Sequence, residues 1–280
     1  MSEFWNYLQN ATGIDRAVLA PILITILVFF CGELFKFLGR AIRKWKRRSN
    51  YRKIFMELSS SISSDILKQS NGFKQLYETL NIENQEGFVM SHATIAHLDN
   101  FLSIPFSDFY DAFFVGRLKK SLELSQFNKV YKHIRSISEI QNDLSSKIDL
   151  TQESYLKYKA KWDENVSNFT FFLEKVIHNP DMQNVHPDQC VRLDKIYKNY
   201  QGTSDRFNPN VIVETLVKPI QNYLKQNGPT PFSLDMLRLA NDTIYSRDNL
   251  NAVLEAHAHE FGVYKDVYDA AYRFLSSLQT

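Results

Sequence analysis

Apolar and polar positions follow two different patterns along the chain. From Ala17 to Gly32, sixteen consecutive residues carry no charge and are nearly all apolar. After Lys53, apolar residues recur at every third or fourth position, which is the period of a helix buried along one side. These patterns predict an all-α protein in which a single N-terminal transmembrane helix is followed by a cytoplasmic multi-helix bundle.

The apolar segment has the length of a membrane span. Residues 17–38 number 22, and a hydrocarbon core of about 30 Å needs about 20 helical residues. Only Glu33 and Lys36 interrupt the segment, one helical turn apart, where the two charges can partly neutralise each other near an interface. Pro21 falls in the first turn, where a missing N–H breaks no helical hydrogen bond. We therefore expect residues 17–38 to form the transmembrane helix.

Charges flanking this segment indicate its orientation. A cleavable signal peptide carries its positive charges before the apolar run, whereas here they follow it. The cytoplasmic side of a span is enriched in Lys and Arg, so we expect an inner (plasma) membrane protein with residues 1–16 outside as a short extracytoplasmic N-terminus. The basic residues after the span are Arg40, Arg43, Lys44, Lys46, Arg47, Arg48, Arg52 and Lys53.

Net charge separates the basic segment from the rest of the chain. Residues 1–53 hold ten Lys and Arg against three acids, a balance of +7, and the other 227 residues hold 23 basic and 28 acidic side chains, a balance of −5. An acidic body disfavours nucleic acid as a partner. A basic collar beside a membrane attracts anionic lipids by about 1 kcal/mol per residue. We predict that the lipid contacts are made by Arg40, Arg43, Lys44, Lys46, Arg47 and Arg48.

Beyond the collar, periodic apolar residues predict a stalk followed by a helical domain. Isoleucine and leucine recur at steps of four from Ile54 to Ile66, so we expect a basic collar and helical stalk over residues 39–71. Asn71 and Gly72 are predicted to end it. The cytoplasmic helical domain is expected over residues 72–280, with a possible sub-boundary near residues 180–187, where polar and Pro residues concentrate.

Two long helices are expected in the first part of this domain. One runs from Phe127 to Leu144, and a second opens at Thr151 and ends before Pro180. Only a few polar residues around Asp149 join them, and short connections favour an antiparallel pair. Ser107 is the expected cap of a preceding helix that carries an aromatic face.

Shorter helices are expected in the last third. One covers residues 187–201 before Gly202, and another starts at the cap Asn208 with Pro209 at its first position. Pro219 is expected to kink or split that helix. Three further helices are expected over residues 233–245, 246–262 and 263–278. The segment NVIVETLV is the one serious strand candidate.

Catalytic signatures are missing from the sequence. Nine scattered glycines form no phosphate-binding loop, and no Gly-x-Ser-x-Gly nucleophile motif occurs. Cys31 and Cys190 provide neither a disulfide framework nor a multi-cysteine metal site. We therefore expect a protein that is not an enzyme and that uses no cofactor.

The segment EAHAHEF comes nearest to a metal-binding pattern. His257 and His259 lie about 200° apart around a helix and cannot share a metal, whereas Glu255 and His259, four residues apart, can. Two ligands are too few, so we predict a solvated ion pair or a core histidine instead. His92 and His97, five residues apart, are a weaker pair.

Two other features have competing interpretations. The aromatic cluster from Phe101 to Phe114 either lines a pocket with the polar residues Asp108, Asp111 and Arg117, or fills the core. Phe and Tyr are abundant in this chain (21 and 14 residues), which favours the core. Glu33 either pairs with Lys36 at the interface or, in an oligomer, ties spans together or lines a cation path, with Gly32 permitting close approach.

Two functions fit these expectations. The first is a single-pass membrane-anchored module that senses or binds a protein partner through its helical domain. The second is an oligomeric membrane effector that forms a pore or disrupts the bilayer, by architectural analogy with the membrane arms of bacterial antiviral defence systems. The expected partners are membrane lipids together with a protein partner, a homo-oligomer or both.

Overall fold

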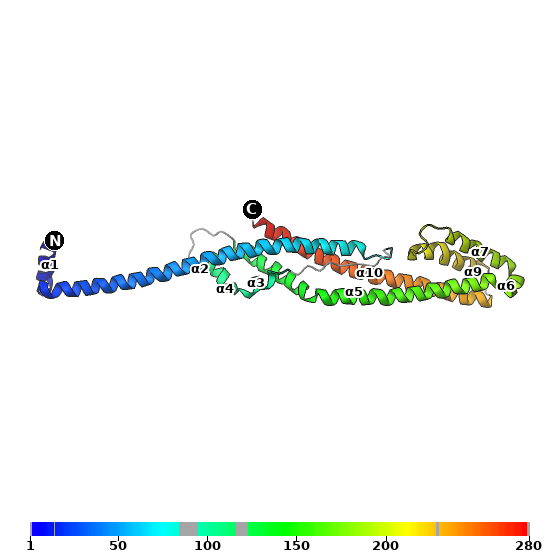
Figure 1. Cartoon of the computed structure of the whole chain (residues 1–280), viewed down its shortest axis with the longest axis horizontal. Helices are drawn as coiled ribbons and strands as arrows, with labels where there is room; N and C mark the ends of the chain where they lie inside the picture. Colours follow the sequence, from blue (N-terminus) through cyan, green and yellow to red (C-terminus); the bar gives the residue numbers. More distant parts are fainter. Residues whose placement is uncertain (1, 14, 84–94, 116–122, 228–229, 279–280) are drawn as a thin grey trace. The chain divides into compact units, whose positions relative to one another are not determined.

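Helices make up the part of the chain that the structure describes. This computed structural model describes residues 2–13, 15–83, 95–115, 123–227 and 230–278 (Figure 1). No strand occurs within these ranges, so the all-α prediction is confirmed. The helices are α1 (Ser2–Thr12), α2 (Arg16–Thr79), α3 (Leu98–Ser103), α4 (Phe106–Phe114), α5 (Leu124–His178), α6 (Pro180–Val185), α7 (Pro187–Gln201), α8 (Pro209–Val211), the π-helix η1 (Ile212–Val217), α9 (Lys218–Gln226) and α10 (Pro231–Ser277).

Contacts divide the chain into two compact units. The first unit comprises Met1–Ser59 and Asp99–Phe127, and the second comprises Ser60–Leu98 and Asn128–Thr280. Helices α2 and α5 each contribute residues to both units. The boundaries predicted at residues 16, 38 and 71 and near residues 180–187 stay predictions.

The first unit begins with a short helix that the sequence pattern did not predict. Helix α1 ends at Thr12 and is followed by Gly13, whose φ of 68° is in the left-handed region that favours glycine. The Gly13 N–H donates to the Gln9 carbonyl at 2.9 Å, which closes the last turn of α1 before α2 starts.

An aromatic core holds α3 and α4 against α2 in the first unit. The buried Phe55 ring lies 5.0–5.7 Å, centroid to centroid, from four other buried Phe rings. These rings belong to Phe101, Phe109, Phe113 and Phe127. Helix α4 follows Pro105 directly, so Ser107 lies inside the helix and the prediction that Ser107 caps it is wrong.

Helix α2 does not end at Asn71-Gly72, as the sequence predicted, but continues to Thr79. Glycine inside a helix costs about 1 kcal/mol, whereas burying a Phe or Leu side chain contributes about 1.5–3 kcal/mol. Phe73 and Leu76, which follow Gly72, are both fully buried, and Phe73 contacts the Phe261 and Tyr268 rings of α10. Packing in the second unit therefore outweighs the local stop signal.

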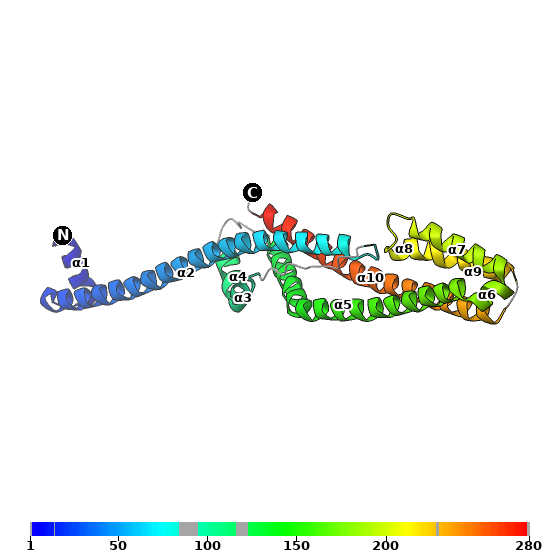
Figure 2. The same cartoon turned by 45° about the vertical axis from the view of Figure 1, so that its right-hand side comes forward.

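Helices α5 and α10 form an antiparallel pair in the second unit (Figures 1 and 2). Along the pair, residue numbers fall on α5 as residue numbers rise on α10. These contacts pair Asn165 with the Asp242 carbonyl, Thr151 with His257, Lys147 with Glu260, and Gln141 with Tyr268.

The two helices predicted on either side of Asp149 are one helix, α5. No Gly or Pro interrupts residues 145–151. Thr151 is buried, and its hydroxyl donates to the Lys147 carbonyl at 2.8 Å within the helix. Because Lys147 and Thr151 both contact α10, packing continues across the polar link. The predicted antiparallel pair is therefore wrong, and the antiparallel partner of α5 is α10.

The three helices predicted after residue 232 are also one helix, α10, which opens with a capping box between Thr230 and Ser233. Gly262 does not end it. A Cβ atom at Gly262 would lie 3.3 Å from Cδ2 of Tyr77 on α2. Gly262 therefore allows α2 and α10 to approach closely and does not end the helix.

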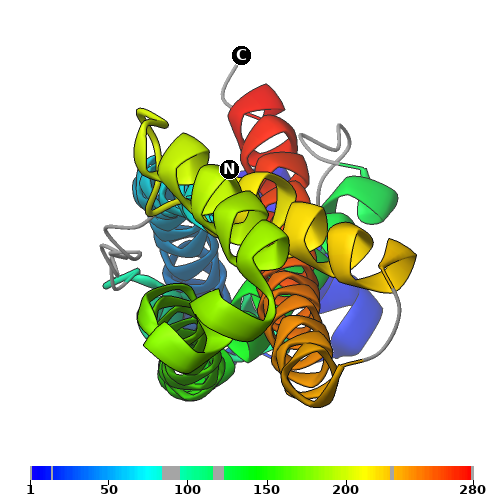
Figure 3. The ribbon, with the colours of Figure 1, turned by 90° about the vertical axis from the view of Figure 1, so that its right-hand side faces the viewer.

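Around Pro219, the chain stays helical by changing its hydrogen-bond register. Residues 212–217 form the π-helix η1, and the Lys218 N–H bonds the Val213 carbonyl five residues back. The wider π turn accommodates Pro219, which lacks the N–H that an α-helix would direct to Thr215. NVIVETLV is thus helical rather than a strand. The prediction that Asn208 caps this helix is confirmed. Figure 3 shows the end of the second unit, where α6, α7 and α9 lie together.

Candidate membrane anchor and collar groove

The N-terminal part of α2 is apolar around its whole circumference. Within the described residues it is long and apolar enough to cross a membrane, and none of its apolar stretch is buried. Residues 26–30 are five consecutive exposed apolar side chains, and at about 100° per residue they cover more than a full turn. A helix without a polar side matches a lipid environment better than the surface of a soluble domain.

Glu33 and Lys36 form an ion pair on this helix. The Lys36 Nζ atom lies 2.8 Å from Glu33 Oε1, one turn along the helix. The predicted pairing is confirmed. Formation of the pair reduces the cost of placing either charge near lipid, because the charges largely cancel at that distance.

Collar residues fall on different sides of α2. Arg47 Nη2 donates to both carboxylate oxygens of Asp108 at 3.1 Å, and its guanidinium lies 5.5 Å from the Tyr51 ring centroid. Hydrogen bonding to Tyr51 and the Asp108 charge raise the pKa of Arg47 above its usual value. The Tyr51 hydroxyl also donates to Asp108, at 3.0 Å. Arg47 thus ties α2 to α4, a role that its place in the sequence did not indicate.

Other collar residues line a groove on α2, which we call the collar groove. Its volume is about 740 Å³. The apolar side chains in it are Phe37, Ala41, Trp45 and Val115, and the basic ones are Arg40, Arg43, Lys44, Arg48 and Arg52. Lys46, which the sequence also predicted as a lipid contact, is exposed and does not line it.

The buried rings of the aromatic cluster form the core of the first unit. Phe101, Phe109 and Phe113 are buried, which confirms the favoured interpretation. Asp108 pairs with Arg47, and Arg117 lies outside the described residues.

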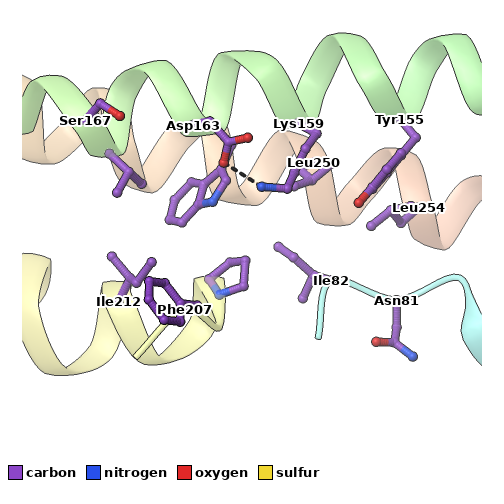
Figure 4. A pocket seen from close by; sticks show the side chains of 13 residues that line it. Asn81, Ile82, Tyr155, Lys159, Asp163, Ser167, Phe207, Ile212, Leu250 and Leu254 are labelled. Atoms are coloured by element: carbon purple, nitrogen blue, oxygen red, sulfur yellow. Dashed lines mark hydrogen bonds and ion pairs between the residues drawn. The ribbon is translucent and has the colours of Figure 1, made fainter. Parts of the chain in front are cut away.

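A second groove lies in the second unit, between α5, α10, α8 and η1 (Figure 4), and we call it the body groove. Its volume is about 450 Å³. Trp162 forms part of its wall and is buried, whereas Phe207 at its edge is 66% exposed. Lys159 and Asp163 pair at 2.5 Å beside it. The apolar wall with one charged pair has the character of a binding groove.

Residues of EAHAHEF bond separately and do not converge. The Thr151 hydroxyl lies 3.1 Å from Nδ1 of His257, and Glu260 contacts Lys147 at 2.7 Å. Glu255 accepts a bond from Asn251 at 2.6 Å. Among the described residues, no three His, Cys, Asp or Glu side chains gather as metal ligands. His92 lies outside the described residues.

Two groups of this segment have lowered pKa values, for different reasons. Burial lowers the pKa of His257, and the nearby Lys147 charge adds to the effect. Burial alone would raise the pKa of Glu260, but hydrogen bonds from Lys147 and Tyr264 and the Lys147 charge lower it overall. Both groups therefore favour the deprotonated state in the folded chain.

The sequence predicted the apolar stretch of α2 and the Glu33–Lys36 pair, but not the shape of either groove. The collar groove has a signal in the sequence, because Phe37, Ala41 and Trp45 alternate large, small and large at steps of four. The body groove has none, because residues far apart along the chain form it. In comparisons with protein-family models, curated proteins and solved structures, nothing matches the chain.

Proposed function

We propose that this protein is a single-pass, non-enzymatic membrane anchor that presents its helical second unit in the cytoplasm to a protein partner. The observation that carries the proposal is the exposed apolar stretch of α2, which leads without a helix break into the basic collar. Such a stretch gains free energy in lipid, and the positive charges after it favour the cytoplasmic side.

The body groove supports the partner-binding part of the proposal. Its apolar wall and the exposed Phe207 at its edge resemble the features that binding sites use for apolar side chains. A partner segment with an aromatic or aliphatic anchor residue would cover Phe207 and remove it from water.

Membrane fractionation tests the anchor. The full-length protein should stay in the membrane pellet after a carbonate wash. Replacing Leu27 and Phe30 with Arg should release it or cause aggregation, because each Arg at the centre of a span costs about 2.5–3.5 kcal/mol on insertion scales. The matched control replaces Leu27 and Phe30 with Ile and Leu. Release of the unmodified protein by carbonate alone would contradict the proposal.

Two readouts in the same membranes test orientation and partner binding. In a Cys31→Ser, Cys190→Ser background, a membrane-impermeant maleimide should label Asn10→Cys and not Lys225→Cys in intact cells. A photo-crosslinking residue at Phe207 should capture one defined partner, whereas one at Val191, which is equally exposed (70% against 66%) but outside the body groove, should not. Equal capture at both positions would contradict a specific binding groove.

An oligomeric membrane effector is the second candidate, favoured by small residues on one face of α2. Thr25, Gly32 and Gly39 recur at seven-residue spacing, and a Cβ atom added at either glycine meets nothing within 4 Å. Such a stripe lets spans approach closely. The native mass in detergent separates the candidates, because an anchor gives a lone protomer, whereas an effector gives a ring of protomers that also makes liposomes leak.

A further inference from the structure

We infer that the collar groove binds one anionic phospholipid, with the lipid phosphate between Arg40, Lys44 and Arg48 and the start of an acyl chain against Phe37 and Ala41. This inference rests on the proposed membrane anchor and adds a defined lipid site to it. The proposed site differs from general attraction of anionic lipids to a basic surface, because side chains on one side of α2 provide the preference for an anionic lipid.

The charge of the collar groove selects an anion. Five of its nine lining residues are Arg or Lys, and none is acidic. Among the described residues, no ion pair joins Arg40, Lys44 or Arg48 to a carboxylate. A phosphate group offers the hydrogen-bond acceptors that these side chains need, and charge-assisted bonds of this kind are the stronger class.

The apolar part of the groove has room for a chain. Phe37, Ala41 and Trp45 follow one another at steps of four and so lie on nearly the same side of α2. Because Ala41 is much smaller than the Phe37 and Trp45 side chains on either side of it, we place the acyl chain in a notch at Ala41. Val115, at the end of α4, lines the groove from a second element. The site is therefore more than the surface of a single helix.

The groove runs along α2 from the end of the apolar stretch through the layer of lipid headgroups and beyond it. Lys44 is six residues beyond Leu38, or about 9 Å along the helix axis, and the headgroup layer extends about 5–8 Å beyond the hydrocarbon on each side. Side chains on a helix lean toward its N-terminus, which here is the side of the span. The leaning directs Lys44 and Arg48 back toward the headgroups.

Arg47 and Lys46 lie apart from this site. Arg47 is engaged with Asp108. Lys46 is two residues from Lys44 and therefore about 200° away around the helix. Lys44 and Lys46 carry the same charge at nearly the same depth, both exposed, so this pair separates a defined site from diffuse electrostatic attraction.

Native mass spectrometry of the full-length protein released from mixed phosphatidylcholine and phosphatidylglycerol vesicles tests the charge requirement. The unmodified protein should retain one phosphatidylglycerol per protomer. Lys44→Gln should lower the preference for phosphatidylglycerol about fivefold, which corresponds to the loss of one basic residue at a membrane surface. Lys46→Gln should lower it by less than twofold. Equal losses in the two variants, or no loss in either, would overturn the inference.

A second variant tests the notch without changing any charge. Ala41→Leu should fill the space between Phe37 and Trp45 and reduce the retained phosphatidylglycerol severalfold. Ile42→Phe adds bulk to the adjacent residue, which lies outside the groove. This variant should retain as much phosphatidylglycerol as the unmodified protein. If Ala41→Leu retains as much phosphatidylglycerol as the unmodified protein, the assignment of the acyl chain to the notch at Ala41 is wrong.

A competition arm identifies the source of the phosphate. Excess inorganic phosphate or glycerol phosphate should not displace the lipid, because neither fills the notch, and displacement would overturn the assignment to a phospholipid. Failure of the anchor is recognised separately, by release of the protein in the carbonate wash. Unmodified protein that remains in the membrane pellet but shows no preference for phosphatidylglycerol overturns only this site.

Discussion

At the scale of single residues, one side chain organises the first unit. Phe55 is fully buried and contacts four Phe rings from α3, α4 and α5. The ring pairs are tilted, edge-to-face or stacked at 5.0–5.7 Å, which are favourable aromatic arrangements. The sequence placed Phe101 and Phe109 in a core, but gave no sign that Phe55 on the stalk is their partner.

Removing this ring should loosen α4. For Phe55→Ala, we expect the opening free energy of the α4 amides, measured by hydrogen exchange, to fall by about 3–5 kcal/mol, the usual cost of a large aromatic truncation in a core. Phe106→Ala is the matched control, because Phe106 is half exposed (45%) and should cost much less. A similar loss in both variants would show that Phe55 is not central.

At the scale of elements, the apolar periodicity predicted the buried helical faces correctly and the helix ends poorly. Periodicity identified Val130, Ile134 and Ile137 as buried, and all three are. The predicted breaks at Asn71-Gly72, Asp149 and Gly262 are absent, because each lies where α2, α5 or α10 packs on a neighbour. Local stop signals cost about 1 kcal/mol or less per residue, which is smaller than the burial that continuation provides.

Asp149→Pro tests the continuity of α5 directly. Proline inside a helix costs about 3 kcal/mol or more, whereas an exposed connecting loop tolerates it. We therefore expect a loss of this size in the free energy of unfolding, measured by chemical denaturation in detergent and followed by circular dichroism. Asp149→Ala should be neutral or slightly stabilising, because Asp149 is exposed and Ala favours helix. A neutral effect of proline would restore the two-helix prediction.

At the scale of the whole molecule, the long α5–α10 pair makes stability depend on pH. Burial, together with nearby Lys charges, lowers the pKa of His257 and of His133 below the ordinary value of 6.5. The unfolded chain therefore binds protons more readily than the folded chain. The stability from these histidines is present above pH 6.5 and is lost as the pH falls below it. Glu260 and Asp269, whose pKa values are also lowered, add a further loss at more acidic pH.

Thermal unfolding between neutral and acidic pH checks this expectation. The midpoint temperature should fall as the pH decreases through the histidine range, and His133→Gln with His257→Gln should flatten that part of the curve. His259→Gln is the control, because His259 is exposed on α10. A midpoint that rises on acidification would contradict the sign of the effect.

The sequence by itself determined the helical class, the apolar N-terminal stretch, the basic collar and the faces that become buried, because these depend on local composition and on the 3.6-residue period. Only the tertiary structure decided where the helices end, that Arg47 pairs with Asp108, and which residues meet in the two grooves. Helix ends and side-chain pairs depend on partners distant in sequence, such as Tyr77 beside Gly262. The free energy of those contacts exceeds local preferences, so periodicity and composition do not reveal them.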